Sequence, residues 1–188
     1  QSSDGGWGAF EPENTQYYLN NIPFSDHGAL LDPPTADVSG RCLSMLAQLG
    51  ELPGNSEPAR RAYDYLLAEQ EDDGSWYGRW GMNYIYGTWT ALCALNAAGI
   101  AHDDARIKRA AQWLISIQNE DGGWGEDGAS YKLDYHGYEK AMSTASQTAW
   151  ALLGLMAAGA VDHPAVARGV AYLVATQREH GLWDETRF

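Results

Sequence analysis

Aromatic side chains are concentrated in the parts of this chain that look least like regular structure. The 188 residues include 8 Trp and 11 Tyr. Many lie in predicted loops or at the starts of predicted buried helices, namely Phe10, Tyr17, Tyr18, Phe24, Tyr77, Trp80, Tyr84, Tyr86 and Trp89. Because the faces of aromatic rings carry partial negative charge, they attract cations. We therefore expect these rings to line a cavity rather than to fill a core.

A few charged side chains are the other candidates for chemistry. Asp37 follows a Pro-Pro turn at the start of a nearly uncharged segment, where an N-cap role would also explain it. Arg41 lies one turn later and needs a buried partner, for which Asp37 is the obvious candidate. Glu126 could act as a general base, although a loop or turn carboxylate is the simpler interpretation.

Metal and phosphate chemistry find little support in the sequence. No Gly-rich phosphate loop and no Gly-x-Ser-x-Gly elbow is present. The five histidines lack the spacing with Cys or acidic residues that a zinc site requires; they are His27, His102, His136, His163 and His180. We therefore expect no metal site.

The elements that position these residues are indicated by a repeat of Gln, three residues, Gly, one residue and Trp. It occurs four times, as the first repeat (Gln1–Gly5–Trp7), the second (Gln70–Gly74–Trp76), the third (Gln118–Gly122–Trp124) and the fourth (Gln177–Gly181–Trp183). The last three follow helical patterns at residues 57–70, 103–118 and 163–177. We expect the Gln amide to bond free carbonyls at a helix end, the Gly to turn, and the Trp to pack back.

The segments between these helices are nearly uncharged. Residues 36–49, 87–98 and 143–158 are apolar on most sides, which is typical of buried helices. An alternation of buried and more polar helices predicts an all-α fold with two concentric layers, an α/α toroid. Longer loops precede the buried helices, at about 8–35, 77–86 and 125–142. Long loops at one end of a rigid barrel are where functional residues usually lie.

Composition limits the partners. The net charge of −13 argues against nucleic acid and against a polybasic membrane patch. One domain over residues 1–188 is the default, and the Gln at position 1 suggests a piece of a longer protein. Cys42 and Cys93 are expected to be small core residues rather than a disulfide.

Several longer segments carry a resemblance to a known family. The four repeats and the segments QSSDGGWGAF, IPFSDHG, DPPTADV, GSWYGRWGMNYIYGTW, QNEDGGWGED and STASQTAWALLGL resemble, in order, the C-terminal part of bacterial squalene–hopene cyclases. The resemblance covers essentially all 188 residues and implies part of one α/α barrel of a class II triterpene cyclase. Such enzymes protonate squalene and cyclise it through carbocations to hopene or hopanol. The resemblance also implies no cofactor and a homodimer attached to the cytoplasmic side of the bacterial membrane.

The same resemblance assigns roles by position. Asp37 resembles the residue that supports the catalytic acid, Arg41 stands where some members have a His, and Tyr86 lies near the proton-donating end. Phe10, Trp80 and Tyr86 resemble residues that face cations in the cavity. Phe24 and Ser25 resemble the constriction of the substrate channel.

The acid itself is missing from these residues. In the family the proton donor lies in an Asp-x-Asp-Asp motif, which this chain lacks. We therefore expect the chain alone to be inactive. Three alternatives stay open: a non-catalytic toroid that binds a hydrophobic ligand or protein partner, a prenyltransferase subunit, and a glycosidase with a facing pair of carboxylates.

Overall fold

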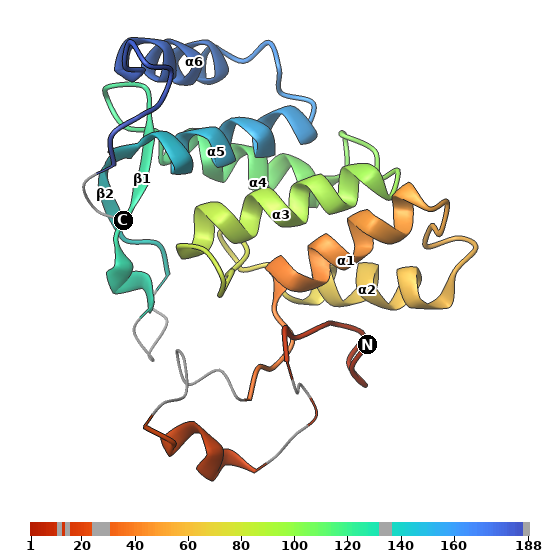
Figure 1. Cartoon of the computed structure of the whole chain (residues 1–188). Helices are drawn as coiled ribbons and strands as arrows, with labels where there is room; N and C mark the ends of the chain where they lie inside the picture. The colour runs from red at the N-terminus through yellow and green to blue at the C-terminus, as the bar shows by residue number, and fades with distance from the viewer. Residues whose placement is uncertain (11–12, 14–15, 24–30, 132–136, 186–188) are drawn as a thin grey trace.

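Six α-helices alternate between two layers in the computed structural model, which describes residues 1–10, 13, 16–23, 31–131 and 137–185. The inner layer holds α1 (Ala36–Gln48), α3 (Asn83–Ala97) and α5 (Ala145–Ala157), and the outer layer α2 (Glu57–Ala68), α4 (Ala105–Ser116) and α6 (Pro164–Thr176). Helix α3 packs between α1 and α5, and each outer helix follows its inner partner in sequence (Figure 1). This arrangement confirms the predicted all-α class with an α/α toroid architecture.

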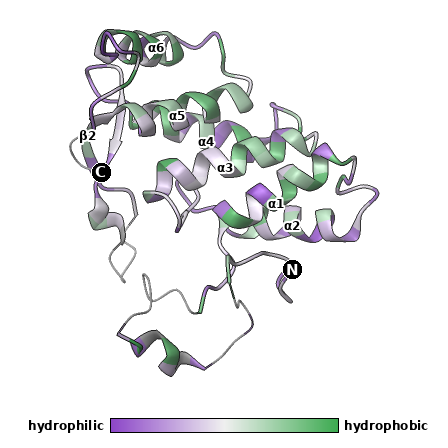
Figure 2. Cartoon of the chain, viewed as in Figure 1, coloured by the Kyte–Doolittle hydropathy of each residue, from purple (hydrophilic) through white to green (hydrophobic). Residues whose placement is uncertain are grey.

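Burial separates the two layers as the sequence predicts. Eleven residues of α3 are buried, and they lie on all sides of the helix. In α2 only Ala59, Ala62, Tyr65 and Leu66 are buried. Figure 2 shows α3 and α5 coloured mostly hydrophobic to neutral, with hydrophilic residues concentrated in turns and at helix ends. A helix that is apolar on most sides can be stable only when neighbours cover it, so the inner position follows from composition.

The loops before the inner helices contain small regular elements that the sequence did not predict. Strand β1 (Trp124–Glu126) pairs antiparallel with β2 (Lys140–Thr144), and Trp124 lies opposite Thr144. The 3-10 helices η1 (Tyr17–Asn21) and η3 (Gly128–Tyr131) lie in the loops that lead to α1 and α5. The β1–β2 pair holds the loop that follows α4 beside the start of α5.

Each of the first three repeats binds the start of an outer helix. In each, the Gln amide donates to the carbonyl of its own Gly and to the carbonyl of the second residue of an outer helix: Gln1 to Gly5 and Pro58, Gln70 to Gly74 and Arg106, and Gln118 to Gly122 and Ala165. The Gly has positive φ in each case, +98°, +100° and +88°. The predicted Gly turn is therefore confirmed. The predicted bond from the Gln amide to free carbonyls at the end of its own helix was wrong, because the amide bonds the Gly carbonyl and the start of the next outer helix instead.

The Trp of each of the last three repeats closes the end of the helix before it. The indole Nε1 of Trp76 donates to the Leu66 carbonyl at 2.7 Å, and Trp124 does the same to Leu114 at 2.7 Å. Trp76 and Trp124 are fully buried, whereas Trp183 of the fourth repeat makes the equivalent bond but remains 37% exposed. Trp183 follows α6, at the open edge of the layers.

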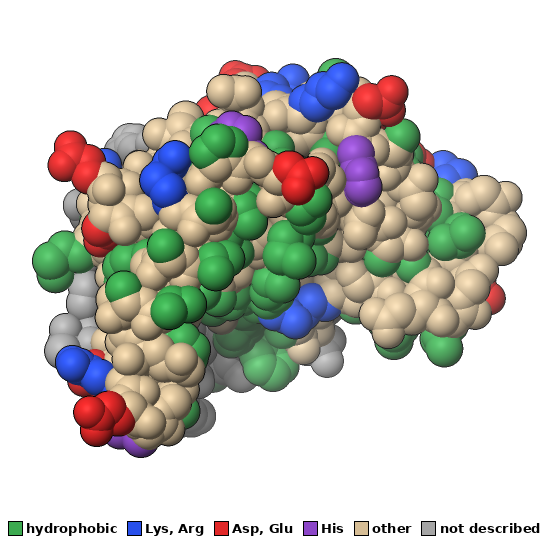
Figure 3. All heavy atoms as spheres, turned by 90° about the horizontal axis from the view of Figure 1, so that it is seen from above, with side chains coloured by type: hydrophobic (Ala, Val, Ile, Leu, Met, Phe, Trp, Pro, Cys, Tyr) green, Lys and Arg blue, Asp and Glu red, His purple; other side chains and the backbone are tan. Residues whose placement is uncertain are grey.

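The edge formed by α6 exposes more apolar surface than the rest of the outer layer. Val170 is 49% exposed, Val174 is 70% exposed and Leu182 is 66% exposed. In the view from above, hydrophobic side chains gather across the middle of the face, with charged groups mainly toward its margins (Figure 3). The two layers therefore end at α6 in a surface that resembles an unfinished interface.

The difference between Trp76 and Trp183 predicts how strongly each stabilises the fold. We expect Trp76→Phe to lower the free energy of unfolding by about 2–3 kcal/mol, because it removes packing and leaves the buried Leu66 carbonyl without a donor. Trp183→Phe should cost less than about 1 kcal/mol in the same chain, because its ring is partly in water already. Denaturant unfolding of both variants checks this. Equal losses would contradict a burial-dependent role.

Candidate functional site

The candidate site lies where the inner helices begin, at the end of the layers that carries the long loops. Asp37 is in the first turn of α1 and is almost fully buried. Its Oδ1 accepts a hydrogen bond from Thr35 Oγ1 at 2.5 Å, and its Oδ2 accepts one from the backbone N–H of Trp80 at 2.8 Å. Thr35, not Asp37, is the N-cap residue of α1. Asp37 thus holds the loop that presents Trp80.

A second buried carboxylate, Asp32, also binds the loop that carries Trp80. It accepts a hydrogen bond from the backbone N–H of Ala9, and its Oδ1 lies 3.0 Å from Nε of Arg79. The neighbours of these two partners are Phe10 and Trp80, whose rings meet edge to face with centroids 5.7 Å apart. Sequence reasoning missed Asp32. The only available signal was its place beside the Pro-Pro turn.

The aromatic pair built on these carboxylates remains open to solvent in this chain. Phe10 is 60% exposed and Trp80 is 37% exposed. The guanidinium carbon of Arg79 also lies 5.8 Å from the centre of the Trp80 ring. Large exposed rings on a rigid, buried support are suited to contact a ligand or another part of a protein.

Arg41 does not pair with Asp37, so that prediction was wrong. Its Nη2 donates to the hydroxyl of Tyr86 at 3.2 Å, and its guanidinium carbon lies 5.6 Å from the Tyr86 ring centre and 5.2 Å from that of Trp89. The carboxylate of Asp37 is already occupied by Thr35 and Trp80. The partners of Arg41 come from α3, across the inner layer.

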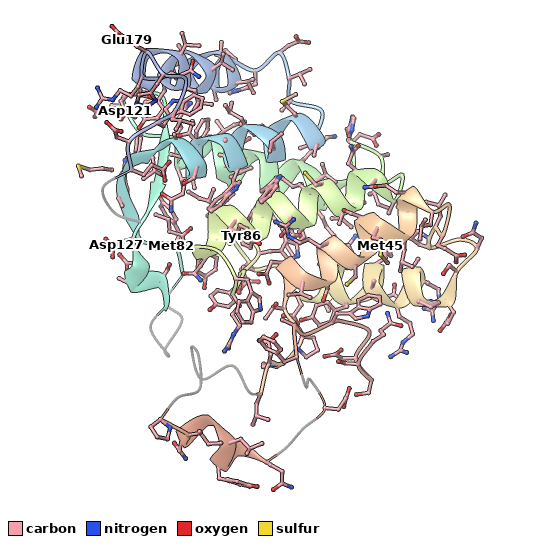
Figure 4. The ribbon with its side chains drawn as sticks, in the orientation of Figure 1. Met45, Met82, Tyr86, Asp121, Asp127 and Glu179 are labelled. Atoms are coloured by element: carbon pink, nitrogen blue, oxygen red, sulfur yellow. The ribbon has the colours of Figure 1, made fainter. Side chains whose placement is uncertain are left out.

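The two rings beside this guanidinium form a cluster with a third ring, Trp150. Tyr86 contacts Trp89 and Trp150 edge to face, with centroids 5.6 Å and 5.0 Å apart, and the two Trp rings stack at 5.9 Å with an interplanar angle of 5°. Tyr86 lies on α3 on the side toward α1 (Figure 4). A pocket of about 250 Å³ opens beside Arg41 and Trp89 and reaches Cys93, which like Cys42 is a free thiol. Trp150 comes from α5, so the cluster joins all three inner helices.

The Trp80 loop and Tyr86 also touch directly. A Cβ at Gly81 would come within 2.5 Å of ring carbons of Tyr86, so only glycine fits this approach. The sequence placed Tyr86 in the loop before a buried helix. In the structure α3 begins at Asn83, and Tyr86 is already helical. The loop that carries Trp80 therefore packs against the Tyr86 ring at the start of α3.

The early start of α3 has a clear cause in Glu126. Its carboxylate is almost fully buried and accepts hydrogen bonds at 3.0 Å from the backbone N–H groups of Asn83, Tyr84 and Ile85. Burial raises the pKa of Glu126, while the N–H donors act in the opposite direction. The interpretation of Glu126 as a plain loop or turn carboxylate was wrong, because it satisfies the first turn of α3.

The structure therefore brings five of the seven predicted site residues to one end of the inner layer: Phe10, Asp37, Arg41, Trp80 and Tyr86. Phe24 and Ser25 lie outside the described residues, and their assignment stays a prediction. Within the described ranges, no three His, Cys, Asp or Glu side chains gather in a way that could hold a metal ion. No described helix is both long and apolar enough to cross a bilayer.

Comparison with known structures defines the class. The chain is similar to the type II terpene cyclase MstE from Scytonema, with 25% identity and a TM-score of 0.63 over 97% of this chain and 48% of that one. The two-layered helical fold is thus that of the α/α toroids of terpene cyclases.

Sequence comparison narrows the class to a family. The family model described as the squalene-hopene cyclase C-terminal domain matches residues 1–188, and the chain belongs to this family. It is 70% identical over 188 residues to a squalene--hopene cyclase of Bradyrhizobium diazoefficiens and 63% identical over 185 residues to one of Zymomonas mobilis. The matches cover 100% and 98% of this chain but only 28% of each relative's length.

The buried contacts of Glu126 predict a large effect of a small change. Glu126→Gln replaces one acceptor oxygen by an NH₂ group that faces backbone donors, so we expect the free energy of unfolding to fall by about 2–3 kcal/mol. Glu120→Gln makes the same chemical change at an exposed position and should cost less than about 0.5 kcal/mol. Chemical denaturation measures both. A Glu126→Gln variant as stable as the Glu120→Gln control would refute the capping role.

Proposed function

We propose that a longer protein containing this chain cyclises squalene to hopene or hopanol through proton-initiated carbocation chemistry. This chain would supply part of the cavity wall. The observation that carries the proposal is the set of ring faces at the starts of the inner helices, in a chain whose close relatives are named squalene--hopene cyclases. A carbocation cascade needs stabilisation of positive charge by groups that do not trap it, and aromatic faces provide this.

Phe10 and Trp80 are the residues we propose to face the cations. Their rings are exposed in this chain, while the backbones beside them are held by Asp32 and Asp37. In a closed cavity without water, each favourable ring face would stabilise a passing cation by about 2 kcal/mol. The edge-to-face contact leaves faces of the two rings at different angles, so successive cations along a folded polyene can be met in turn.

Asp37, Arg41 and Tyr86 are proposed to support the acid. The family's proton donor is a carboxylic acid in an Asp-x-Asp-Asp motif outside this chain. An arginine side chain cannot relay a proton, but the positive charge of Arg41 would favour the ionised form of a nearby carboxylic acid. That makes the donor a stronger acid. The hydrogen bond from Arg41 to Tyr86 fixes both groups at the end of the wall that Asp37 anchors.

Squalene turnover by the longer protein tests the proposal. We expect pentacyclic products by gas chromatography–mass spectrometry. Trp80→Ala should slow formation of the complete product roughly thirtyfold, equivalent to about 2 kcal/mol, and release partly cyclised products. Asp37→Asn should collapse the rate with little change in the product pattern. Glu120→Gln serves as the exposed-carboxylate control and should behave like the unmodified protein.

The same assay separates this proposal from its alternatives. The 188-residue chain alone should give no product, because the proton donor is not among its residues. Hopene formed by the chain alone would contradict the need for the upstream acid. A folded longer protein that binds squalene without converting it would instead support a non-catalytic toroid that binds a hydrophobic ligand.

We further propose that the longer protein is a homodimer attached to the cytoplasmic side of the bacterial cytoplasmic membrane. The support for this is the family resemblance. We expect the longer protein to float with phospholipid vesicles in a density gradient and to have twice the protomer mass by light scattering in detergent. Monomers that stay with the soluble fraction would contradict both parts.

A further inference from the structure

Both neighbours of α3 approach it closely at the turn that carries Trp89. A Cβ placed on Gly40 of α1 would lie 3.1 Å from the carbonyl oxygen of Thr90, and one placed on Gly154 of α5 would lie 3.4 Å from the Cα of Trp89. A glycine on each neighbouring helix therefore lets the helix approach this turn of α3, which lies between them (Figure 1). The backbone of Trp89 is thus packed from two sides.

The ring of Trp89 is also held by rings from two helices. It stacks on Trp150 of α5, with centroids 5.9 Å apart and an interplanar angle of 5°. Tyr86, one turn earlier on α3, meets it edge to face with centroids 5.6 Å apart. Because packing against neighbours restricts the rotamers of a side chain, the half-buried ring of Trp89 has a defined orientation.

The side chain of Arg41 depends on these rings for its position. It is exposed, and among the residues that the structure describes it makes a single hydrogen bond, to the Tyr86 hydroxyl at 3.2 Å, and no ion pair. One hydrogen bond fixes a distance but leaves the plane of the guanidinium free to turn. Trp89 restricts that rotation, because the guanidinium carbon lies 5.2 Å from its ring centre, within the range of cation–π attraction.

The groups that face this guanidinium leave its charge unneutralised. On α3 the ionisable groups beside Arg41 are the hydroxyl of Tyr86 and the thiol of Cys93. Burial raises the pKa of that thiol, so it is uncharged at neutral pH. Helix α5 contains no ionisable side chain. On α1, both carboxylate oxygens of Asp37 have other partners.

We propose that Trp89 is a positioning residue, whose ring, supported by Trp150, holds the guanidinium of Arg41 in the place and orientation from which it acts on the acid. A pocket of about 250 Å³ is lined by Arg41 and Trp89 together, so the charge is held and remains accessible. The inference rests on the proposed function for the identity of the acid. Because the energy of two charges depends on their separation, a guanidinium that moved freely would strengthen the acid less.

The pH dependence of squalene turnover by the longer protein tests this role. The donor acts in its protonated form, so the rate falls as pH rises through the pKa of the donor. Arg41→Gln removes the positive charge and raises that pKa, so the alkaline limb should move up by roughly one pH unit while the rate below the limb falls. Trp89→Leu should reproduce most of this shift, and the double variant should add nothing to it. Trp89→Phe keeps a ring and should stay near the unmodified profile.

Trp113→Leu is the matched control for these variants. Trp113 is a buried residue of the outer helix α4 and meets Tyr138 edge to face, with centroids 5.7 Å apart. Its replacement should destabilise the protein without moving the alkaline limb. An unmoved limb in Trp89→Leu, or a further shift in the double variant, would overturn the proposal. An unmodified longer protein that converts no squalene would overturn the proposed function, and the next measurement would then decide on Trp89.

A double-mutant cycle on the denaturation midpoint tests the contact without any activity. Trp89→Leu should lower the midpoint of the longer protein less when Arg41→Gln is already present, because the contact between the ring and the guanidinium has then been lost. Equal losses in the two backgrounds would refute the positioning role of Trp89, whether or not the protein converts squalene.

Discussion

The inner helices begin at buried or half-buried residues, where the N–H groups of a first turn have little access to water. This constraint explains much of the structure around the candidate site. Glu126 supplies a carboxylate to three N–H groups of α3, and Glu185 supplies one to the N–H and hydroxyl of Ser146 at the start of α5. Each of these glutamates comes two residues after the Trp of a repeat. An inner helix and the outer helix that follows it form one hairpin. The segment after the repeat of an outer helix therefore also supplies hydrogen-bond acceptors to the start of the inner helix in the same hairpin.

In the first hairpin, α1–α2, the donor and acceptor roles of the loop and the helix start are exchanged. The second repeat has Gly78, not Glu, two residues after its Trp, and here the inner helix supplies the carboxylate. Asp37 of α1 accepts the N–H of Trp80 from the loop that follows the repeat. The loop still contacts the helix start, but the loop residue that makes the contact, Trp80, carries an aromatic side chain. The buried carboxylates of Asp37 and Glu126 are tolerated because each is hydrogen-bonded, since an unpaired buried carboxylate would be costly.

The sequence predicted those features that depend on nearby residues. Helix alternation follows from the period of apolar residues, and the turns follow from Gln, Gly and Trp at fixed offsets. It failed where partners are distant along the chain. Glu126 meets α3 41 to 43 residues away, and Arg41 meets Tyr86 45 residues away. The i, i+4 spacing of Asp37 and Arg41 shows only that they share a helix face. It does not reveal that each of these side chains has other partners.

The contacts of Arg41 and those of the Phe10–Trp80 pair form two regions that differ in charge. A fixed positive charge near a carbocation would be repulsive, and its contacts with Tyr86 and Trp89 occupy ring surface that a carbocation could otherwise use. The Phe10–Trp80 pair belongs to a separate contact set, supported by Asp32 and Asp37. Under the proposed function, the region around Arg41 is suited to strengthen an acid, and the Phe10–Trp80 pair to receive positive charge. Helix α1 anchors both regions, through Asp37 to Trp80 and through Arg41 to Tyr86.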